Sequence, residues 1–257
     1  MFDIFVKKSE VVVDCFTHHQ SAFQYTPIDF GSRFYPEWWK KSEKFYVDEQ
    51  GSSKATIKNC VGFIEYYKNN LILPSWFEMD LNVHEQGNEK WWTYEGSNQY
   101  VVTNSTHGRK SFEKFALDNG NNIKLTSPWG LKTKENINWV WTQPTWNLRE
   151  HLPIFVVLPA VVEFKYQHAT NVNLFVVNED KFKKTTIAPN TPLVSLHPMT
   201  EKKIVLKRHL VTYEEFLQTL DGVASLFMRR DYFDFSKLYK KKKEFLDKQS
   251  KCPFNKK

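Results

Sequence analysis

Eight histidines are the residues of this chain best suited to metal binding or acid–base chemistry. Cupin-like iron sites bring two His and a carboxylate together, usually from a His-x-Asp or His-x-Glu pair on one strand. No such pair occurs, and Glu163 and His168 have opposite parity on the strand expected there. His168 and His197 are the best metal candidates. We therefore expect no metal and no cofactor, with a cupin-like metal-dependent enzyme as the weaker alternative.

Nucleophile patterns are equally sparse. The sequence lacks a Gly-x-Ser-x-Gly elbow, a P-loop and a dinucleotide fingerprint. Ser195 and His197 share a strand face, but neighbours of this kind are usually structural. Cys60 has apolar neighbours on an expected helix, which predicts a buried, unreactive thiol. No catalytic residue can be assigned, and the pattern favours a protein without enzymatic activity.

The cysteines and the apolar runs indicate a compartment. Cys15, Cys60 and Cys252 are widely spaced and form no Cys-x-x-Cys pair, which predicts free thiols in a reducing cytosol. The longest apolar run, residues 154–162, contains Pro159 and is too short to span a bilayer. The N-terminus has no apolar stretch of signal-peptide length. We expect a soluble protein made inside a cell, with no membrane span.

Tryptophans give the strongest indication of a binding surface. All nine lie between Trp38 and Trp146. In residues 137–143, Trp139 and Trp141 fall on one strand face, and Trp129 and Trp146 flank that strand. Indole faces stack on sugar rings and nucleobases, so these four are the binding candidates. The alternative is a large aromatic core, although nine indoles are hard to bury in one domain and at least two should be exposed.

The net charge of +7 comes from the C-terminus. Residues 237–257 hold nine Lys against two acidic residues, and the remaining 236 residues hold 27 of each sign. The run Lys240, Lys241, Lys242 and Lys243 is either a solvated helix end or a tether with weak, nonspecific affinity for nucleic acid or another acidic surface.

Short β-branched and aromatic segments separated by turn residues predict a β-rich fold. Strands are expected at 10–16, 71–83, 90–95, 99–104, 110–117, 137–143, 160–168, 172–177, 185–189, 192–199 and 202–209. This spacing is typical of an antiparallel β-sandwich or jelly roll.

Helices are expected at both ends of this β-rich region. In residues 36–45, Pro36 can begin a short helix that turns Trp38 and Trp39 onto the body while the lysines stay in water. The alternative is an exposed aromatic platform. Residues 59–69 predict a second helix, so 36–68 is a helical clamp on a single domain, 1–210. Residues 211–257 are expected as C-terminal helices, the first with a Thr212–Glu215 capping box and an end at Gly222.

Several segments together resemble a known family. They are PIDFGSRFYPEWWKK, TIKNCVGFIEYYKNNLILPSWFEMDL, SPWGL, and NTPLVSLHPM followed by KKIVLKRHLVTYEEF. In this order they resemble uncharacterised proteins of tailed bacteriophages of marine bacteria and, more loosely, a bacterial family with a domain of unknown function. The resemblance covers about residues 10–215 and carries over no catalytic residue.

The resemblance implies a phage-encoded protein in the cytoplasm of an infected bacterium or in the virion. A non-enzymatic role in binding other phage or host proteins fits this context. A carbohydrate-binding β-sandwich that uses exposed tryptophans is the alternative.

Overall fold

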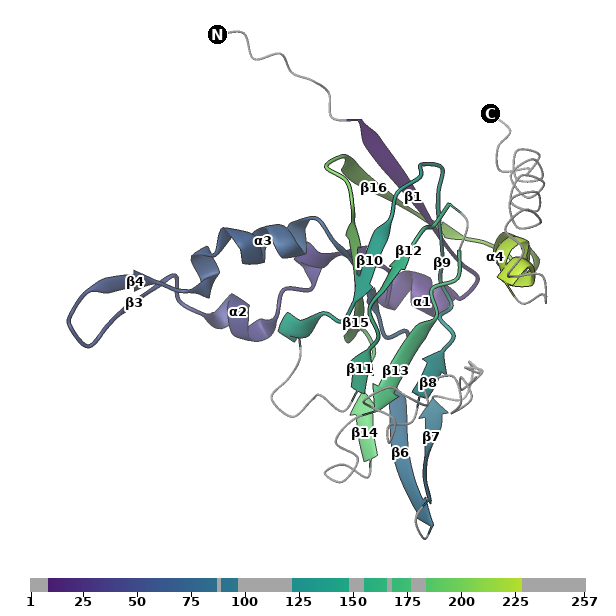
Figure 1. Ribbon diagram of the computed structural model, residues 1–257, viewed down its shortest axis with the longest axis horizontal. Coiled ribbons are helices and arrows are strands. Elements are labelled where there is room, and N and C mark those ends of the chain that lie inside the picture. The colour runs from purple at the N-terminus through teal and green to yellow at the C-terminus, as the bar shows by residue number, and fades with distance from the viewer. Residues whose placement is uncertain are drawn as a thin grey trace.

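The computed structural model describes residues 9–86, 89–96, 122–147, 155–165, 168–176 and 184–227. Strands dominate these ranges, as the sequence predicts, and they form several sheets (Figure 1). These described ranges hold four α-helices, which are short except the last: α1 (Gln20–Tyr25), α2 (Glu37–Lys41), α3 (Val61–Lys68) and α4 (Tyr213–Phe227). The same part of the chain also contains the 3-10 turns η1 (Gly31–Arg33), η2 (Ile57–Asn59) and η4 (Thr145–Asn147).

The largest sheet has five antiparallel strands. Its order is β12 (Ala160–Val162), β10 (Trp139–Thr142), β15 (Pro192–Pro198), β5 (Leu71–Pro74) and β2 (Asp29–Phe30). The central strand β5 is apolar throughout, and β15 is apolar except at Ser195 and His197, because both faces of these strands are largely buried.

A second sheet brings the two ends of the described chain together. Its order is β16 (Lys203–Leu210), β1 (Glu10–Thr17) and β9 (Gly130–Thr133). β1 pairs with β16 in parallel and with β9 in antiparallel orientation, so this sheet departs from the all-antiparallel expectation. The buried carboxylate of Asp29 ties this sheet to β2, because it lies 2.5 Å from Nη2 of Arg208.

Three smaller antiparallel sheets complete the strands. They are β11–β13–β8 (Phe155–Val157, Val172–Val176, Asn122–Leu125), β14–β6–β7 (Lys184–Ile187, Met79–Gln86, Glu89–Gly96) and β3–β4 (Phe45–Val47, Ser53–Ala55). Figure 1 shows β6 and β7 extending from one end of the body and β3–β4 from its side.

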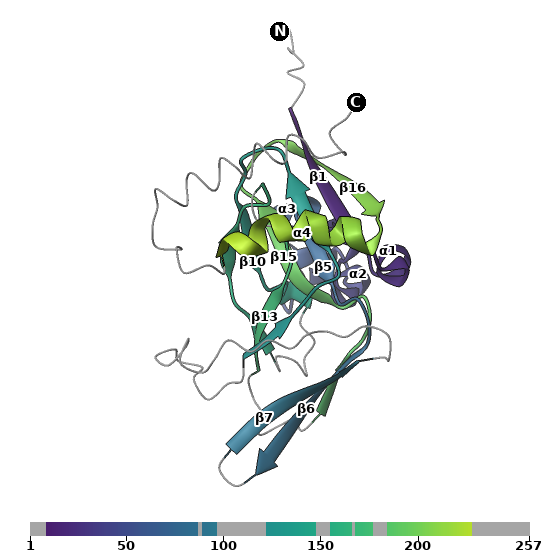
Figure 2. The same cartoon turned by 90° about the vertical axis from the view of Figure 1, so that its right-hand side faces the viewer.

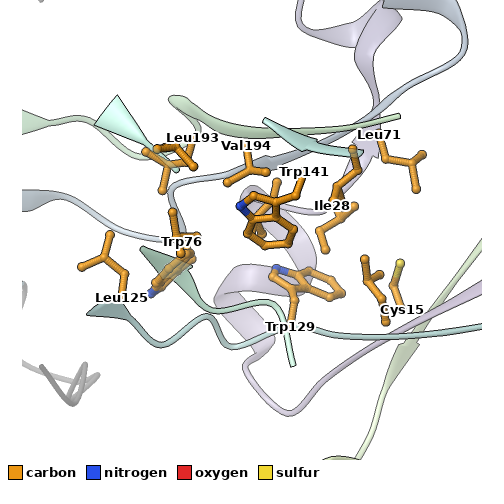
Figure 3. Packing of buried hydrophobic residues seen from close by; sticks show 14 of the residues in the cluster. Cys15, Ile28, Leu71, Trp76, Leu125, Trp129, Trp141, Leu193 and Val194 are labelled. Atoms are coloured by element: carbon orange, nitrogen blue, oxygen red, sulfur yellow. The ribbon is translucent and has the colours of Figure 1, made fainter. Parts of the chain in front are cut away.

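One hydrophobic core receives side chains from every sheet except β3–β4. β1 alternates regularly, with Val11, Val13 and Cys15 fully buried. Trp129, just before β9, and Trp141 of β10 face one another across this core in Figure 3. This shared core is what fixes the sheets relative to one another.

Residues 36–68 form a projection that we call the arm. It contains α2, β3, β4, η2 and α3, and it extends sideways from the sheets in Figure 1. The two predicted helices are present, but a β-hairpin that the sequence analysis missed lies between them. Gly51 closes its turn with a φ of 79°, a conformation that glycine adopts without strain.

The helix α4 lies against β9 and beside the end of β16, as Figure 2 shows. The predicted capping box is confirmed, since Glu215 N–H donates to Thr212 Oγ1 at 3.3 Å and Thr212 N–H donates to Glu215 Oε2 at 2.9 Å. The helix continues past Gly222 to Phe227, so the predicted end is wrong. Helical bonds and packing together exceed the cost of about 1 kcal/mol for one internal glycine.

Two predicted strands are broken in the structure. Residues 71–83 split into β5 and β6, because buried Ser75 leaves the sheet to exchange backbone hydrogen bonds with Thr191 and Asn190. Residues 160–168 contribute only β12 before a turn at Phe164 and Lys165. The strands predicted at 99–104 and 110–117 lie outside the described residues.

Candidate binding surface at the base of the arm

The helices α2 and α3 hold a cluster of aromatic rings where the arm meets the body. We call it the aromatic cluster; it comprises Tyr35, Trp38, Trp39, Phe63, Tyr66, Tyr67 and Trp146. Trp39 stacks on Tyr35 with ring centres 4.4 Å apart and on Phe63 at 5.3 Å. Phe63 and Tyr67 are buried one helical turn apart on α3, so their rings meet on one face.

The turn η4 brings Trp146 from the end of β10 to this cluster. The Trp146 ring meets Phe63 edge-on, with centres 5.2 Å apart, and lies 6.3 Å from the Trp38 ring. The indole N–H of Trp38 donates to the backbone oxygen of Trp146 at 3.0 Å. These contacts join the first turn of the arm to a segment 108 residues later in the chain.

A second hydrogen-bonded link fixes the opposite helix of the arm. The phenol of Tyr67 donates to Asn147 Oδ1 at 2.7 Å, and Asn147 Nδ2 donates to the backbone oxygen of Phe34 at 2.8 Å. Burial raises the pKa of Tyr67, which keeps the phenol protonated as a donor at physiological pH. The base of the arm is therefore attached through both α2 and α3.

The outer rim of the cluster faces solvent. Trp38 and Trp146 are each 42% exposed, although their rings neighbour one another. The ammonium of Lys58 lies 5.3 Å from the centre of the Trp39 ring and donates to the Lys40 backbone oxygen at 2.5 Å. Two adjacent, anchored and partly exposed indoles can stack on a sugar ring or pack against an apolar protein surface.

Trp38 and Trp39 are adjacent in α2 but have different surroundings. Trp39 packs inward on Tyr35 and Phe63, as the clamp interpretation predicts, while Trp38 keeps much of its surface in water. The lysines of α2 stay in water as expected, and Lys40 pairs with Glu37 at 2.7 Å. Each of the two alternatives therefore describes one of the two indoles.

The other predicted binding tryptophans belong to the core. Trp129 and Trp139 are fully buried and Trp141 is 5% exposed, so none of the three offers a face to a ligand. In β10, Trp139 and Trp141 are buried on one face while Val140 and Thr142 are half-buried on the other. Of the four candidates, Trp146 alone is exposed, and with Trp38 it confirms that at least two indoles are accessible.

The two metal candidates lie on different elements with different partners. His168 is buried, and its Nδ1 lies 2.8 Å from the backbone oxygen of Thr219 in α4. His197 belongs to β15, where its ring packs on Tyr66 with centres 4.6 Å apart. Burial lowers the pKa of both histidines. Across the described ranges, no group of three His, Cys, Asp or Glu side chains is placed to hold a metal ion.

Ser195 and His197 are in contact, as their shared strand face predicts. The Ser195 hydroxyl lies 2.9 Å from His197 Nε2 and 2.6 Å from the side-chain amide of Asn70. Ser195 and Asn70 are fully buried, so a substrate cannot reach the hydroxyl. This polar group instead joins β15 to the end of α3. Cys60, predicted to be buried, is exposed at the start of α3.

A pair of histidines lies where β1, α1 and α4 meet. The rings of His18 and His19 are 3.8 Å apart, and His18 also contacts Tyr213 and Phe216 of α4. Burial lowers the pKa of His18, and burial together with the neighbouring His18 lowers the pKa of His19 to about 4. Both rings are therefore held neutral by their surroundings near pH 7.

The sequence analysis considered Trp38 only in the alternative of an exposed aromatic platform, and it missed the hairpin of β3 and β4. The one-turn spacings Tyr35–Trp39 and Phe63–Tyr67 are the signals that could have assembled the cluster. The residues between Val47 and Ser53 contain Asp48 and Gly51, a recognisable hairpin turn. Lys240, Lys241, Lys242 and Lys243 lie outside the described residues.

Comparison of the chain with protein-family models, with curated proteins and with solved structures finds no match. Among the helices that the structure describes, none is both long and apolar enough to cross a membrane.

Proposed function

We propose that this chain is a phage-encoded binding protein without enzymatic activity, present in the infected bacterial cytoplasm or in the virion. The observation that carries the proposal is the exposed Trp38–Trp146 pair at the base of the arm. The resemblance to tailed-phage proteins supports the context.

The Trp38–Trp146 pair has the properties of an interaction hot spot. Its aromatic rings are large, and hydrogen bonds and ring contacts fix them before a partner arrives. Preorganisation lowers the entropy that binding must overcome, and Trp is enriched among the residues that dominate binding energy. The partner expected here is another phage protein or a host protein with an apolar recess.

The test uses phage that carry Trp38→Ala in the full-length gene, with Tyr25→Ala as the matched control. Tyr25 is a largely exposed aromatic residue of α1, away from the arm. Quantitative mass spectrometry of purified virions should find the wild-type chain and the control at equal abundance and the Trp38 variant depleted. If purified virions lack the wild-type chain, the virion role is excluded. If the wild-type chain, the Trp38 variant and the Tyr25 control are incorporated equally, the arm is excluded as the surface that attaches the chain to the virion.

Carbohydrate binding is the second candidate, and the adjacency of the two exposed indoles favours it. A pyranose ring can stack on one indole while the neighbouring ring contacts its edge. A glycan array probed with the full chain and with Trp146→Ala separates the two proposals. Glycan binding that is lost in the variant supports this candidate, and absence of binding to any glycan on the array argues against it.

The lysine-rich tail is a proposed nonspecific contact with nucleic acid. Neutralising Lys240, Lys241, Lys242 and Lys243 with glutamine should lower retention on heparin at low salt and flatten its salt dependence, because such binding releases counterions. Unchanged retention would leave only a role in solubility for these lysines.

We also propose that the five-stranded sheet and the β16–β1–β9 sheet form a β-sandwich of jelly-roll type. Their common core around Trp129 and Trp141 supports this packing. An experimental structure with the two sheets side by side rather than face to face would contradict it.

A further inference from the structure

The tip of the arm exposes an apolar strand on both faces. Phe45, Tyr46 and Val47 of β3 are 59%, 53% and 70% exposed, and the residues of β4 are exposed as well. No side chain of either strand joins the hydrophobic core. A two-stranded hairpin alone is marginally stable in water, so a third strand added to this sheet would stabilise it.

The hydrogen bonds of the hairpin show which backbone groups of β3 are open. Asp48 N–H donates to Ser52 at 2.9 Å, and Thr56 N–H donates to Lys44 at 3.0 Å. Bonded pairs alternate along an antiparallel ladder, so Lys44, Tyr46 and Asp48 turn their backbone groups toward β4. The N–H and C=O groups of Phe45 and Val47 consequently point out of the open edge.

The sequence of this edge is complementary to itself. Residues 44–48 read Lys-Phe-Tyr-Val-Asp. When two such strands run antiparallel about a two-fold axis at Tyr46, Phe45 faces Val47 of the other copy and Lys44 faces Asp48. The outward backbone N–H and C=O groups of Phe45 in one copy then bond to those of Val47 in the other. This matches the alternation of hydrogen-bonded and non-hydrogen-bonded pairs in an antiparallel ladder.

The side chains agree with the same register. Phe45 and Val47 share one face of β3 and would form cross-strand apolar pairs, while Lys44, Tyr46 and Asp48 share the other face. The Asp48 carboxylate is held by the backbone N–H groups of Gln50 and Ser52 at 3.0 and 2.8 Å. Its other oxygen lies 3.7 Å from Lys54 Nζ, and the second copy's Lys44 would join this ion pair. Pairing ends there, because Glu43 would next meet Glu49.

We propose that two copies of this chain associate through the open edge of β3, forming a four-stranded antiparallel sheet in the order β4–β3–β3–β4. The opposite edge of the hairpin is β4, with Ser53, Lys54 and Ala55. Two copies of this strand could form neither large apolar pairs nor pairs of opposite charge. The partner is thus a second copy, since one edge supplies both halves of every pair.

This pairing goes beyond the proposed binding function and does not depend on it. Trp38 and Trp146 lie at the base of the arm, whereas β3 lies at its far end (Figure 1). A dimer joined at the tips leaves both indole pairs exposed and presents them in duplicate.

The first test is sedimentation equilibrium of the full chain from about 1 μM to about 1 mM. The average mass should rise from 30.6 kDa toward twice that value. Val47→Pro should weaken association at least about tenfold, because proline removes an outward N–H and places its ring on the edge. Ser53→Pro is the matched control on the opposite edge and should change association by less than about twofold.

The second test fixes the register by cross-linking. In a chain whose Cys60 and Cys252 are replaced by serine, Tyr46→Cys places the two new thiols opposite each other in a non-hydrogen-bonded pair, where Cα atoms lie about 4.5 Å apart. Mild oxidation should give a covalent dimer. Phe45→Cys should not, because its partner position is Val47.

Three outcomes would overturn the proposal. A chain that stays monomeric to about 1 mM leaves the edge to a different protein or to none. A dimer that survives Val47→Pro uses another surface. If both proline variants lose the dimer and Tyr46→Cys gives no covalent dimer, the proline substitutions have disrupted the hairpin itself and the proposal fails. If both lose the dimer but Tyr46→Cys does give a covalent dimer, the pairing through β3 stands.

Discussion

Strand β10 and helix α2 each carry two tryptophans, but the structure treats the two pairs differently. In β10, Trp139 and Trp141 are two residues apart and both are buried in the common core. In α2, Trp38 and Trp39 are adjacent, and only Trp39 packs between other rings while Trp38 is 42% exposed. Residues two apart on a strand point to the same face, so both tryptophans of β10 are buried together. Adjacent residues on a helix point in different directions, so only one tryptophan of α2 packs inward.

The difference shows that large aromatic residues serve two purposes in this chain. The body buries Trp76, Trp129, Trp139 and Trp141 in the common core, where they contribute to the free energy of folding. At the base of the arm, Trp38 and Trp146 are anchored by a hydrogen bond and by edge contacts with Phe63, but each stays 42% exposed. Indoles that stay partly exposed bury less apolar surface, so they contribute less to the free energy of folding than the buried ones.

Replacing Trp139 with alanine is expected to have the largest effect on stability. The fully buried ring packs on Phe164 with centres 5.7 Å apart, and its removal leaves a large cavity. The free energy of unfolding should fall by about 3–5 kcal/mol. Urea unfolding followed by circular dichroism measures the change.

Trp139→Phe is the control for this effect. The indole N–H of Trp139 is buried without a hydrogen-bond partner in the described parts of the chain, so phenylalanine keeps much of the packing and removes an unpaired donor. The phenylalanine variant should therefore be clearly more stable than the alanine variant. Equal losses would mean that the cavity does not control stability at this position.

Gly31→Ala tests the junction between the body and the arm. A Cβ at this position would lie 1.7 Å from Asn70 Oδ1 and 2.7 Å from the backbone oxygen of Tyr67. The added methyl group must displace Asn70 or the end of α3, and unfolding free energy should fall by about 1–3 kcal/mol.

Gly62→Ala provides the matched comparison within the arm itself. The nearest atom to its Cβ would be Cys60 Sγ at 3.9 Å, so nothing obstructs the methyl group. Because alanine favours a helix over glycine, α3 should gain up to about 1 kcal/mol. Thermal unfolding of both variants measures the contrast, and a destabilised Gly62→Ala would refute the view that α3 is uncovered there.

Lowering the pH should reduce the stability of the body, because its histidines become protonated. The arm contains no histidine. The folded-state pKa of His19 is about 4, below its ordinary value of 6.5, and that of His18 is lowered as well. The unfolded chain therefore binds more protons than the folded chain in this interval. Stability is complete above pH 6.5 and is lost as pH falls toward 4.

We expect a loss on the order of 1 kcal/mol between these pH values, because both histidines are partly exposed and solvent screens the effect. Urea unfolding at several pH values measures it. His19→Gln keeps a polar side chain without a titrating proton and should flatten the pH dependence. A slope that is unchanged in this variant would assign the effect to other groups.

The sequence predicted some strands of the body closely and missed the hairpin of the arm for a physical reason. Periodicity reports burial on one face, and strands such as β1 and β10 have such a face, so their positions were predicted closely. β3 has no buried face, and its three consecutive apolar residues match neither a strand nor a helix pattern. Its formation depends on the turn at Gly51 and on bonds to β4.

The candidate site was predicted only in part because it is assembled across a long sequence distance. Trp146 was chosen from composition, but its neighbours Trp38 and Phe63 come from segments that local patterns cannot bring together. Trp129 was chosen on the same grounds and lies in the core. A single sequence shows which residues have the chemistry of a site, and packing decides which of them reach the surface.

Trp38→Ala should have the smallest effect on folding and thereby sharpens the contrast with Trp139. The variant loses ring contacts with Phe63 and Trp146 and the hydrogen bond to the Trp146 backbone oxygen. That carbonyl, at an exposed residue, can bond to water instead. We expect unfolding free energy to change by less than about 1 kcal/mol. Urea unfolding of Trp38→Ala beside Trp139→Ala measures the difference on one scale. If the two losses of unfolding free energy are similar, Trp38 is part of the folding core, and the base of the arm is not a surface kept open for a partner. If Trp38→Ala is nearly as stable as the wild-type chain, any binding that this variant loses is a direct property of that surface.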